Sequence, residues 1–353
     1  MLNEKYSSFR NRITESAQGK KIPLTVMFEL TYRCNFACKH CYLPNSYRKN
    51  YGELESKEIF AILEQLKDSG CFYLGFTGGE LFVRQDAIDI LRYAKKCGFE
   101  TTIYSNGSLI DKKLADELAI LNPSAVEITI HSLKEKSFER ITGIKGSWKK
   151  VFNAVHLLHQ RKVNLGFKAC VLKENQNETK QIFSFAASLG ARCRFDHTLF
   201  PRLNGSKAPY RYRGGIKLSK TDILQMKRYL NVQNWKDCDF RQKKGNEVLS
   251  DIFSCAIGKS HAAITPLGEI KLCVMIERYK YRILDSSLID GWSRLIKKAE
   301  DIKPDKNYRC KECDLRNFCR WCPATSWLNS RDFTSCEPIY RKKIEFIIKN
   351  MKA

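Results

Sequence analysis

Residues 24–42 read LTVMFELTYRCNFACKHCY, a strand pattern that runs directly into a cysteine loop. The first part, Leu24–Leu30, is an apolar run that predicts a strand. Cys34, Cys38 and Cys41 follow with the spacing C-x3-C-x2-C, and three thiolates on one short loop can converge on an iron–sulfur cubane. A closed 4Fe–4S site takes four ligands, so three leave one iron open to a substrate or cofactor. Structural zinc is the competing interpretation, but it also takes four ligands.

Beyond this loop, short apolar runs alternate with amphipathic stretches up to about residue 195. Strands alternating with helices predict an α/β fold with a parallel sheet and right-handed crossovers. The pattern fits an open doubly wound sheet or a barrel, and in both cases the chemistry gathers at the C-terminal ends of the strands. The predicted strands are Leu24–Leu30, Phe72–Thr77, Phe99–Tyr104, Ala125–Ile130, Asn164–Leu172 and one beginning with Arg192–Phe195. The predicted helices are Ser56–Ser69, with a serine start and Gly70 as a stop, Ala87–Cys97, Asp111–Leu121, Ser147–Arg161 and Thr179–Leu189.

The cysteine loop resembles that of the radical SAM superfamily, with an aromatic-like His40 before the last cysteine and Tyr42 after it. The second predicted strand ends in TGGE, residues 77–80, which is similar to the family's Gly-Gly-Glu motif. Glycines permit close backbone approach. Glu80 can accept charge-assisted hydrogen bonds from the ammonium group of S-adenosylmethionine. The other interpretation of Glu80 is a carboxylate at a helix N-terminus.

The resemblance covers residues 22–200 and implies a partial (β/α)6 barrel. It also implies reductive cleavage of S-adenosylmethionine to a 5′-deoxyadenosyl radical, which then abstracts a hydrogen atom. Single residues in the later strands and helices also match cofactor-contacting positions of the family, but ordinary packing or turn roles explain them about as well. The residues that the resemblance assigns to cofactor binding are His40, Gly78, Gly79, Glu80, Ser105, Asn106, Thr129, Arg140 and Leu172.

A second set of cysteines occupies the C-terminal part of the chain. Cys255, Gly268 and Cys273 form C-x12-G-x4-C, and a C-x2-C-x5-C-x2-C series from Cys310 and a final Cys336 follow. This order resembles the SPASM extension of radical SAM enzymes, which usually holds two auxiliary 4Fe–4S clusters. A zinc ribbon would explain the middle series alone and leave the other cysteines unexplained.

The resemblance implies a ligand set for each auxiliary cluster. The inner set has three thiolates, so its fourth ligand could be His261, a substrate or water. A surface or core role for His261 is an equally good interpretation. The outer set is Cys310, Cys313, Cys319 and Cys336, and the inner set is Cys255, Cys273 and Cys322.

The expected organisation is an N-terminal extension (1–21), a radical SAM partial barrel (22–200), a linking region (201–254) and a cysteine-rich SPASM domain holding auxiliary clusters (255–353). The chain has 353 residues and 15 cysteines. It has no apolar run long enough to span a membrane and no signal peptide, so we expect a cytoplasmic protein. Disulfides are rare in that compartment, which favours metal binding as the role of the cysteines.

The resemblance implies a maturase that crosslinks or oxidises side chains of a ribosomally made peptide or protein. Formylglycine formation in sulfatases is an alternative, although that branch carries an Asp at the position of Val274. An enzyme acting on RNA or a small metabolite, a non-enzymatic electron-transfer protein and a zinc-dependent structural protein are further alternatives. The sequence offers no clear catalytic acid or base in the barrel.

The net charge of +24, from 62 Lys and Arg against 38 Asp and Glu, favours acidic partners or simply serves solubility. We expect a peptide substrate with an acidic leader, presented by the basic surface or by a separate peptide-recognition protein. A flavodoxin or ferredoxin is expected as the reductant, because cleaving S-adenosylmethionine needs a low-potential electron. We expect neither a membrane nor a nucleic acid as a partner.

Overall fold

The structure, a computed structural model, describes residues 2–49, 52–214, 252–253, 255–306, 308–311, 313, 315, 321–336, 341–342 and 345. The predicted ligand Cys319 and most of the predicted linking region 201–254 lie outside these residues. In the described part of the chain, no helix is long and apolar enough to cross a membrane.

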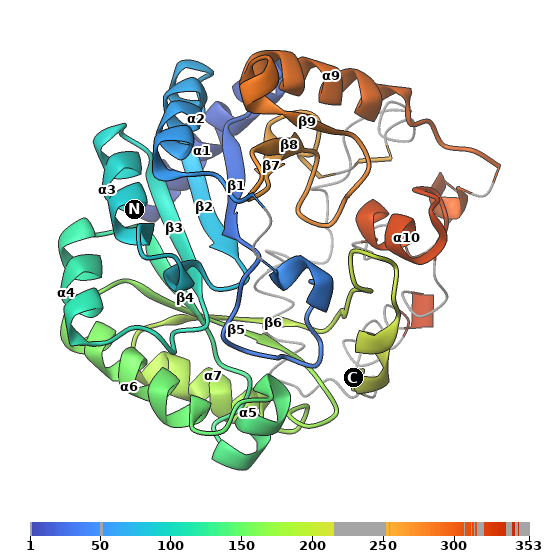
Figure 1. Ribbon diagram of the computed structural model, residues 1–353. Coiled ribbons are helices and arrows are strands. Elements are labelled where there is room, and N and C mark those ends of the chain that lie inside the picture. The colour runs from blue at the N-terminus through green and yellow to red at the C-terminus, as the bar shows by residue number, and fades with distance from the viewer. Residues whose placement is uncertain are drawn as a thin grey trace.

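Within the described residues, nine strands form one sheet in the order β6-β5-β4-β3-β2-β1-β7-β8-β9 (Figure 1). Consecutive strands from β1 to β6 pair in parallel, as the alternating pattern predicted. The other side of β1 pairs in parallel with β7, and β8 and β9 follow in antiparallel register. The strands are β1 Thr25–Thr31, β2 Tyr73–Gly78, β3 Glu100–Ser105, β4 Ala125–Thr129, β5 Leu165–Cys170, β6 Arg192–Asp196, β7 His261–Ile264, β8 Glu269–Lys271 and β9 Lys280–Arg282.

Helices α2, α3, α4, α6 and α7 connect successive parallel strands and lie along one side of the sheet (Figure 1). A doubly wound sheet would carry helices on both faces. The sheet is therefore the wall of a partial barrel with β6 and β9 at its edges, and the α/β fold with a parallel sheet is confirmed. The helices are α1 Leu2–Gly19, α2 Ser56–Asp68, α3 Ala87–Lys96, α4 Lys112–Leu121, α5 Glu135–Thr142, α6 Ser147–Gln160, α7 Thr179–Ser188, α9 Leu288–Asp301 and α10 Pro323–Ser330.

Helix α2 shows why these segments form helices and where they pack. Ile59, Ile62, Leu63 and Leu66 recur at helical spacing and are at most 1% exposed. Burying each of these side chains stabilises the packed helix by about 2 kcal/mol relative to leaving it in water. Strand β3 shows the corresponding pattern for a strand: every second residue is buried beneath the helices.

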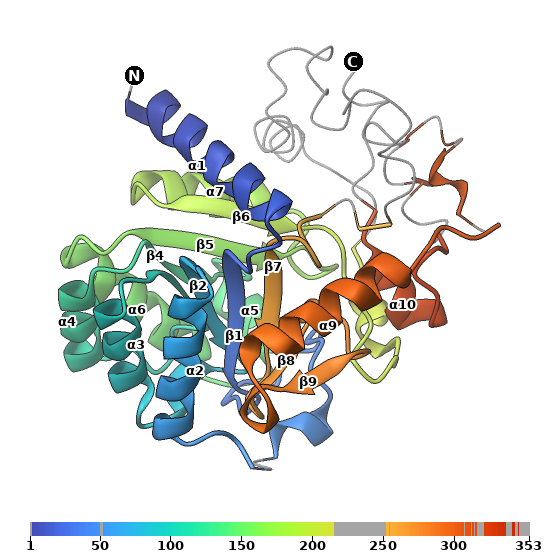
Figure 2. The same cartoon turned by 90° about the horizontal axis from the view of Figure 1, so that it is seen from above.

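The C-terminal region begins as an extension of the barrel sheet. Strand β7 lies beside β1, with Thr25 opposite His261 and Phe28 opposite Ile264. Helix α9 packs across β8 and β9 on the same side as α2 (Figure 2). The chain thus brings residues after 255 next to the strand that leads into the first cysteine loop.

The six predicted strands and five predicted helices are all present, with ends shifted by at most two residues. The first predicted helix begins at Ser56, as predicted, although the N-cap residue is Glu55 and not a serine. The residue before the helix is Glu55, whose N–H donates to the carboxylate of Glu58 at 2.8 Å, while Ser56 donates to Asp86 at 2.6 Å. Helix α5 and the strands β7–β9 were not predicted, because each is too short to show a clear period.

Candidate active site

The first cysteine loop begins where β1 ends and rests on the C-terminal end of α5. The backbone N–H groups of Ala37 and Lys39 donate to the carbonyl oxygens of Thr142 at 2.9 Å and Ile141 at 3.1 Å. The last carbonyls of a helix have no partner within the helix, so they are available to hold another segment. The unpredicted helix α5 therefore fixes the loop that carries the predicted cluster ligands.

The thiols of Cys34, Cys38 and Cys41 are free and half-buried, and all three pack against the core. Burial raises the pKa of Cys34 to about 11. Burial also raises the pKa of Cys38 well above its ordinary value, and the nearby Cys41 and Cys34 thiols raise it further. The N–H of Phe36 donates to the sulfur of Cys34 at 3.4 Å. The three thiols thus lie near one another, and binding iron there requires that they lose their protons.

Gly78 and Gly79 bring the end of β2 onto the backbone that enters this loop. A Cβ on Gly78 would lie 2.1 Å from the carbonyl oxygen of Thr31, and one on Gly79 would lie 2.2 Å from that of Arg33 and 2.6 Å from that of Tyr32. The Gly79 N–H donates to the Thr31 oxygen at 2.7 Å. The close approach expected of these glycines is therefore made to the chain itself.

Replacing Gly79 with alanine is expected to lower the free energy of unfolding by about 2 kcal/mol, because the new methyl group overlaps backbone atoms that cannot move independently. Urea titration followed by circular dichroism measures this loss. Gly19→Ala is the matched control, since nothing lies within 4 Å of a Cβ there. Equal stability of the two variants would show that the backbone contact is not tight.

Glu80 is fully buried and receives three hydrogen bonds. Its carboxylate accepts from the Phe82 N–H at 3.2 Å, the Ser105 hydroxyl at 2.8 Å and the Asn106 N–H at 2.6 Å. Burial raises its pKa to about 7 in spite of these donors. The first of them makes Glu80 the N-cap of a short 3-10 helix, Leu81–Val83, so the helix-terminus interpretation is confirmed. The contact with an ammonium group stays a prediction.

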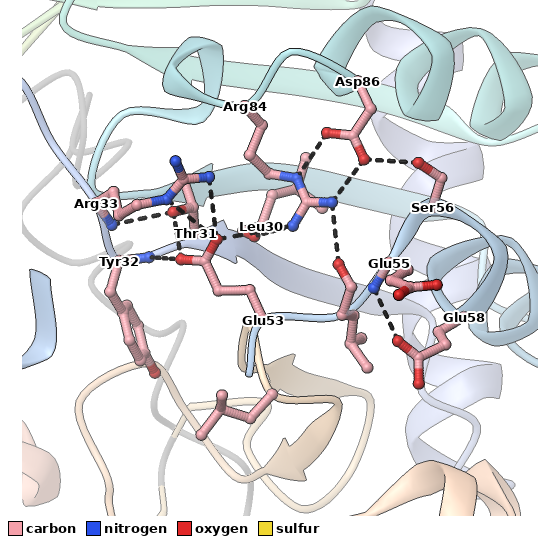
Figure 3. Close-up of polar contacts among 12 residues, drawn as sticks. Leu30, Thr31, Tyr32, Arg33, Glu53, Glu55, Ser56, Glu58, Arg84 and Asp86 are labelled. Atoms are coloured by element: carbon pink, nitrogen blue, oxygen red, sulfur yellow. Dashed lines mark hydrogen bonds and ion pairs between the residues drawn. The ribbon is translucent and has the colours of Figure 1, made fainter. Parts of the chain in front are cut away.

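A buried carboxylate, Glu53, holds the last residues of β1 (Figure 3). It accepts hydrogen bonds from the Thr31 hydroxyl at 2.6 Å, the Tyr32 N–H at 3.3 Å and Arg33 Nε at 3.3 Å. The Arg33 guanidinium also forms an ion pair with it at 3.2 Å. Because Cys34 is the next residue, this carboxylate fixes the direction in which the chain enters the cysteine loop.

Arg84 completes the same network from the segment after β2 (Figure 3). Its side chain is 6% exposed and pairs with Asp86 at 2.6 Å and, more distantly, with Glu53 at 3.9 Å. It donates to the backbone oxygens of Leu30 at 3.2 Å and Leu54 at 3.0 Å. A planar guanidinium with several donors suits such a site, since it can hold three segments at once.

Three C-terminal cysteines also lie near one another. Cys273 follows β8, and Cys322 is the N-cap residue of α10. Burial raises the pKa of Cys273 to about 12, and the nearby Cys322 and Cys255 thiols raise it further. These are the three cysteines that the resemblance to SPASM extensions assigned to the inner auxiliary cluster. Of the predicted outer set, the structure describes Cys310, Cys313 and Cys336 but not Cys319.

Comparison with known proteins shows which family the strand and cysteine-loop region resembles. Residues 28–186 match the Radical SAM superfamily. This chain contains a radical SAM domain. An AdoMet-dependent heme synthase from Oleidesulfovibrio alaskensis is 22% identical over 346 residues, which cover 89% of this chain and 86% of that protein. The antilisterial bacteriocin subtilosin biosynthesis protein AlbA of Bacillus subtilis is 25% identical over 278 residues, covering 76% of this chain and 59% of AlbA.

A solved structure shows the same fold over nearly the whole chain. Streptococcus suis SuiB bound to its precursor peptide SuiA matches with a TM-score of 0.68 and 17% identity, covering 97% of this chain and 82% of SuiB. This likeness shows the fold, and the match over residues 28–186 contains the cysteine loop and the TGGE strand end on which the expected radical SAM domain rests.

Two histidines of the radical SAM domain meet beside the cysteine loop. The rings of His40 and His131 are in edge contact, with centroids 4.6 Å apart. Burial lowers the pKa of His40 to about 4. Burial, and to a lesser extent the neighbouring His40, lowers the pKa of His131 well below its ordinary value. Their Nδ1 atoms are buried and make no hydrogen bond to any described residue. His131 was not predicted, because it lies just after a strand without a motif around it.

The cofactor residues predicted from single-residue matches lie at different places in the domain. Thr129 ends β4 and is half-buried, and Leu172 is fully buried two residues after β5. Arg140 is exposed on α5. Ser105 and Asn106 both contact Glu80, so the structure joins these two to the Gly-Gly-Glu motif. The roles of all five toward a cofactor stay predictions.

Asn175 is a buried side chain that the sequence did not single out. Its amide accepts from the Leu172 N–H at 2.7 Å and donates to the carbonyl oxygens of His131 at 2.7 Å and Cys170 at 2.9 Å. It thus joins the chain after β4 to the end of β5. The turn-forming segment KENQN, residues 173–177, is the signal that could have indicated it.

Charged side chains occupy the sheet face opposite the helices, where sequence reasoning found no acid or base. The Lys168 ammonium lies 3.7 Å from the centroid of the Tyr104 ring. Burial lowers its pKa to about 8, and Arg194 lowers it further while Glu127 opposes the shift. Alternating polar residues in β5 and β6 were the available signal, since strands covered on both faces are apolar throughout.

The residues present fit the groups that a radical SAM enzyme needs. Within the described ranges, no three Cys, His, Asp or Glu side chains are close enough to share one metal ion. A cubane binds each thiolate through a different iron, so its ligands stand apart. The unpaired Nδ1 atoms of His40 and His131 lie next to this loop and offer polar contacts to a bound cofactor.

Proposed function

We propose that this radical SAM enzyme modifies a ribosomally made peptide or protein by hydrogen-atom abstraction, forming a crosslink or oxidising a side chain. Cys34, Cys38 and Cys41 would hold the 4Fe–4S cluster, and Glu80 would bind the ammonium group of S-adenosylmethionine. When bound, the reduced cluster supplies the electron that splits S-adenosylmethionine into methionine and a 5′-deoxyadenosyl radical. The inner and outer C-terminal cysteine sets would hold two auxiliary clusters.

The observation that carries this proposal is the proximity of the two cysteine groups. Tyr42 directly follows Cys41, and Cys273 of the second group is also near it: burial and Glu29 raise the pKa of Tyr42, and Cys41 and Cys273 raise it further. A substrate bound beside the first loop would then have the second cysteine group nearby. That arrangement suits an oxidation in which the radical removes one hydrogen atom and a nearby auxiliary cluster accepts the second electron.

The partners follow from the same chemistry. A flavodoxin or ferredoxin would supply the low-potential electron, and a reducing compartment such as the cytoplasm would keep the ligand thiols free. The net charge of +24 favours a substrate with an acidic leader, presented directly or by a separate recognition protein. Leader binding should weaken as salt is added, because exposed charges are screened.

A small-metabolite substrate is the second candidate. It is favoured by the similarity to an AdoMet-dependent heme synthase, which extends over 89% of this chain. Formylglycine formation is less well supported, because the position after Cys273 is Val274, whose side chain cannot act as a base. Mass spectrometry separates these candidates, since each substrate class yields a different product.

The decisive experiment uses protein purified without oxygen. Iron and labile sulfide are measured, and the protein is incubated with dithionite, S-adenosylmethionine and either a candidate peptide encoded beside its gene or a porphyrin. About twelve irons per chain, 5′-deoxyadenosine and a peptide that has lost two hydrogen atoms would support the maturase. Modification of the porphyrin alone would favour the second candidate. Zinc in place of iron, or no cleavage in reduced protein, would refute both.

Binding of S-adenosylmethionine should be stronger at pH 7.5 than at pH 6, by roughly eightfold. Glu80 titrates near pH 7, and only its ionised form attracts the ammonium group. Equilibrium dialysis with reconstituted protein measures the two dissociation constants. 5′-Methylthioadenosine, which lacks the amino-acid part, is the control and should bind equally at both pH values. The same pH dependence for both ligands would exclude the contact with Glu80.

A further inference from the structure

A lysine that is completely buried lies between two carboxylates near both cysteine groups. Lys271, the last residue of β8, and Glu29 of β1 each have a side chain that is 0% exposed. The ammonium nitrogen is 3.2 Å from Glu29 Oε2, 2.8 Å from Glu277 Oε1 and 3.1 Å from the carbonyl oxygen of Val274. All three donors of the ammonium therefore have acceptors.

Three tyrosines complete this cluster, which we name the Lys271 brace: Glu29, Lys271, Glu277, Tyr32, Tyr42 and Tyr47. The hydroxyls of Tyr42 and Tyr32 donate to the Glu29 carboxylate at 3.2 and 3.3 Å. That of Tyr47 donates to Glu277 at 3.4 Å. Each carboxylate is thus satisfied on both sides, and buried networks of this kind specify one arrangement only when every member is paired.

The sheet register explains how Lys271 reaches Glu29 across an intervening strand. Ala263 of β7 is the partner of both Met27 on β1 and Lys271 on β8. Directly opposed residues project from the same face of a sheet. The short side chain of Ala263 leaves the lysine stem free to pass over β7 toward β1.

The brace joins the two cysteine loops. Tyr42 directly follows Cys41, and Lys271 precedes Cys273 by two residues and binds the backbone of the residue after it. We propose that Lys271 is a positioning residue that holds the Cys273 loop in fixed register against the first cysteine loop, and so sets the environment of the inner auxiliary cluster. This inference rests on the proposed function, because it takes Cys273 as a ligand of that cluster.

A charged brace has a cost that an apolar contact would not have. Burying ions is unfavourable, and well-packed apolar residues often replace a buried ion pair without loss of stability. Apolar residues cannot replace the directional hydrogen bonds of Lys271, since each of these bonds requires its acceptor at one place. The brace therefore suits a site where two loops must keep one relative position.

The test compares Lys271→Met with Lys280→Met, both purified and reconstituted without oxygen. Lys280 pairs with Glu269 at 3.0 Å and Glu277 at 3.6 Å, so its variant also loses ion pairs, but Glu29 and the Cys273 loop keep theirs. Lys271→Met is expected to change or lose the electron paramagnetic resonance signal of the inner cluster, with up to about four irons lost per chain. The signal of the first cluster should stay unchanged in Lys271→Met. The Lys280→Met protein should have the same spectrum and iron content as the unchanged enzyme.

Two further variants keep the result decisive. If Lys271→Met does not fold, the double variant Glu29→Gln/Lys271→Met removes the unpaired buried charge of Glu29, and its spectrum should still differ from that of the unchanged protein. A spectrum and iron content equal to those of the unchanged protein would overturn the inference. Cys273→Ala separates the assignment of Cys273 as a cluster ligand from the positioning role of Lys271. If Cys273→Ala loses iron while Lys271→Met keeps its iron and spectrum, only the positioning role is refuted. No loss of iron refutes the cluster assignment and the brace with it.

Discussion

Replacing Cys34, Cys38 and Cys41 together with alanine is expected to abolish cleavage of S-adenosylmethionine and to remove about four of about twelve irons per chain. These thiols lie near one another on a loop held by α5, and residues 34–41 contain no other cysteine. Anaerobic iron analysis and chromatography of 5′-deoxyadenosine measure both effects. About eight irons should remain, because the C-terminal cysteines are untouched.

The matched control for this variant is Cys97→Ala. Cys97 lies at the end of α3, where its thiol donates to Glu64 at 3.4 Å, far in the sequence from both cysteine sets. This variant should keep its iron and its activity. If the triple variant still formed 5′-deoxyadenosine, the assignment of the first loop as the cluster site would be wrong. If it lost all of its iron, the C-terminal cysteines would not be independent cluster ligands.

Replacing Arg84 with methionine is expected to lower the free energy of unfolding by about 3 kcal/mol. The change removes the donors to the Leu30 and Leu54 carbonyls and leaves the nearly buried Glu53 with less positive charge nearby. Methionine fills much of the same volume, so the loss reports on the polar contacts and not on a cavity. Urea titration of the apoprotein, followed by circular dichroism, measures this change without any contribution from bound iron.

Arg92→Met is the control for Arg84, because it also breaks two ion pairs, with Asp89 and Glu117. The side chain of Arg92 is 53% exposed, and exposed pairs contribute little to stability. We expect its unfolding curve to overlay that of the unchanged protein. An Arg84 variant with the same curve would show that the network of Figure 3 does not hold the end of β1.

The core of the fold could be predicted because its signals are local. A strand followed by C-x3-C-x2-C, and a second strand ending in TGGE, need only a few adjacent residues to be visible. The alternation of strands and helices then predicted a parallel sheet, since a strand–helix–strand crossover favours parallel pairing. Helix α5 escaped prediction because eight residues show too little periodicity, although its last carbonyls hold the cysteine loop.

The site could be predicted only in part, because its second half depends on contacts between distant segments. No local pattern indicates that Lys271 would be buried against Glu29, or that His131 would meet His40. The sequence placed Cys255, Cys273 and Cys322 together through a family resemblance, and the structure brings them near one another. Lys168 was not predicted either, because its burial against Tyr104 depends on a neighbouring strand that lies far away in the sequence.

By itself, the sequence indicated which cysteines are candidates for binding iron, where the strand ends lie and which family the chain resembles. These properties are encoded in residue type and short spacing, which do not change on folding. The tertiary structure alone decided how the C-terminal region joins the barrel. Strand β7 pairs with β1, and this places Cys273 beside the first cysteine loop. Such pairing depends on burial and hydrogen bonding between segments far apart in the chain, so only the folded molecule specifies it.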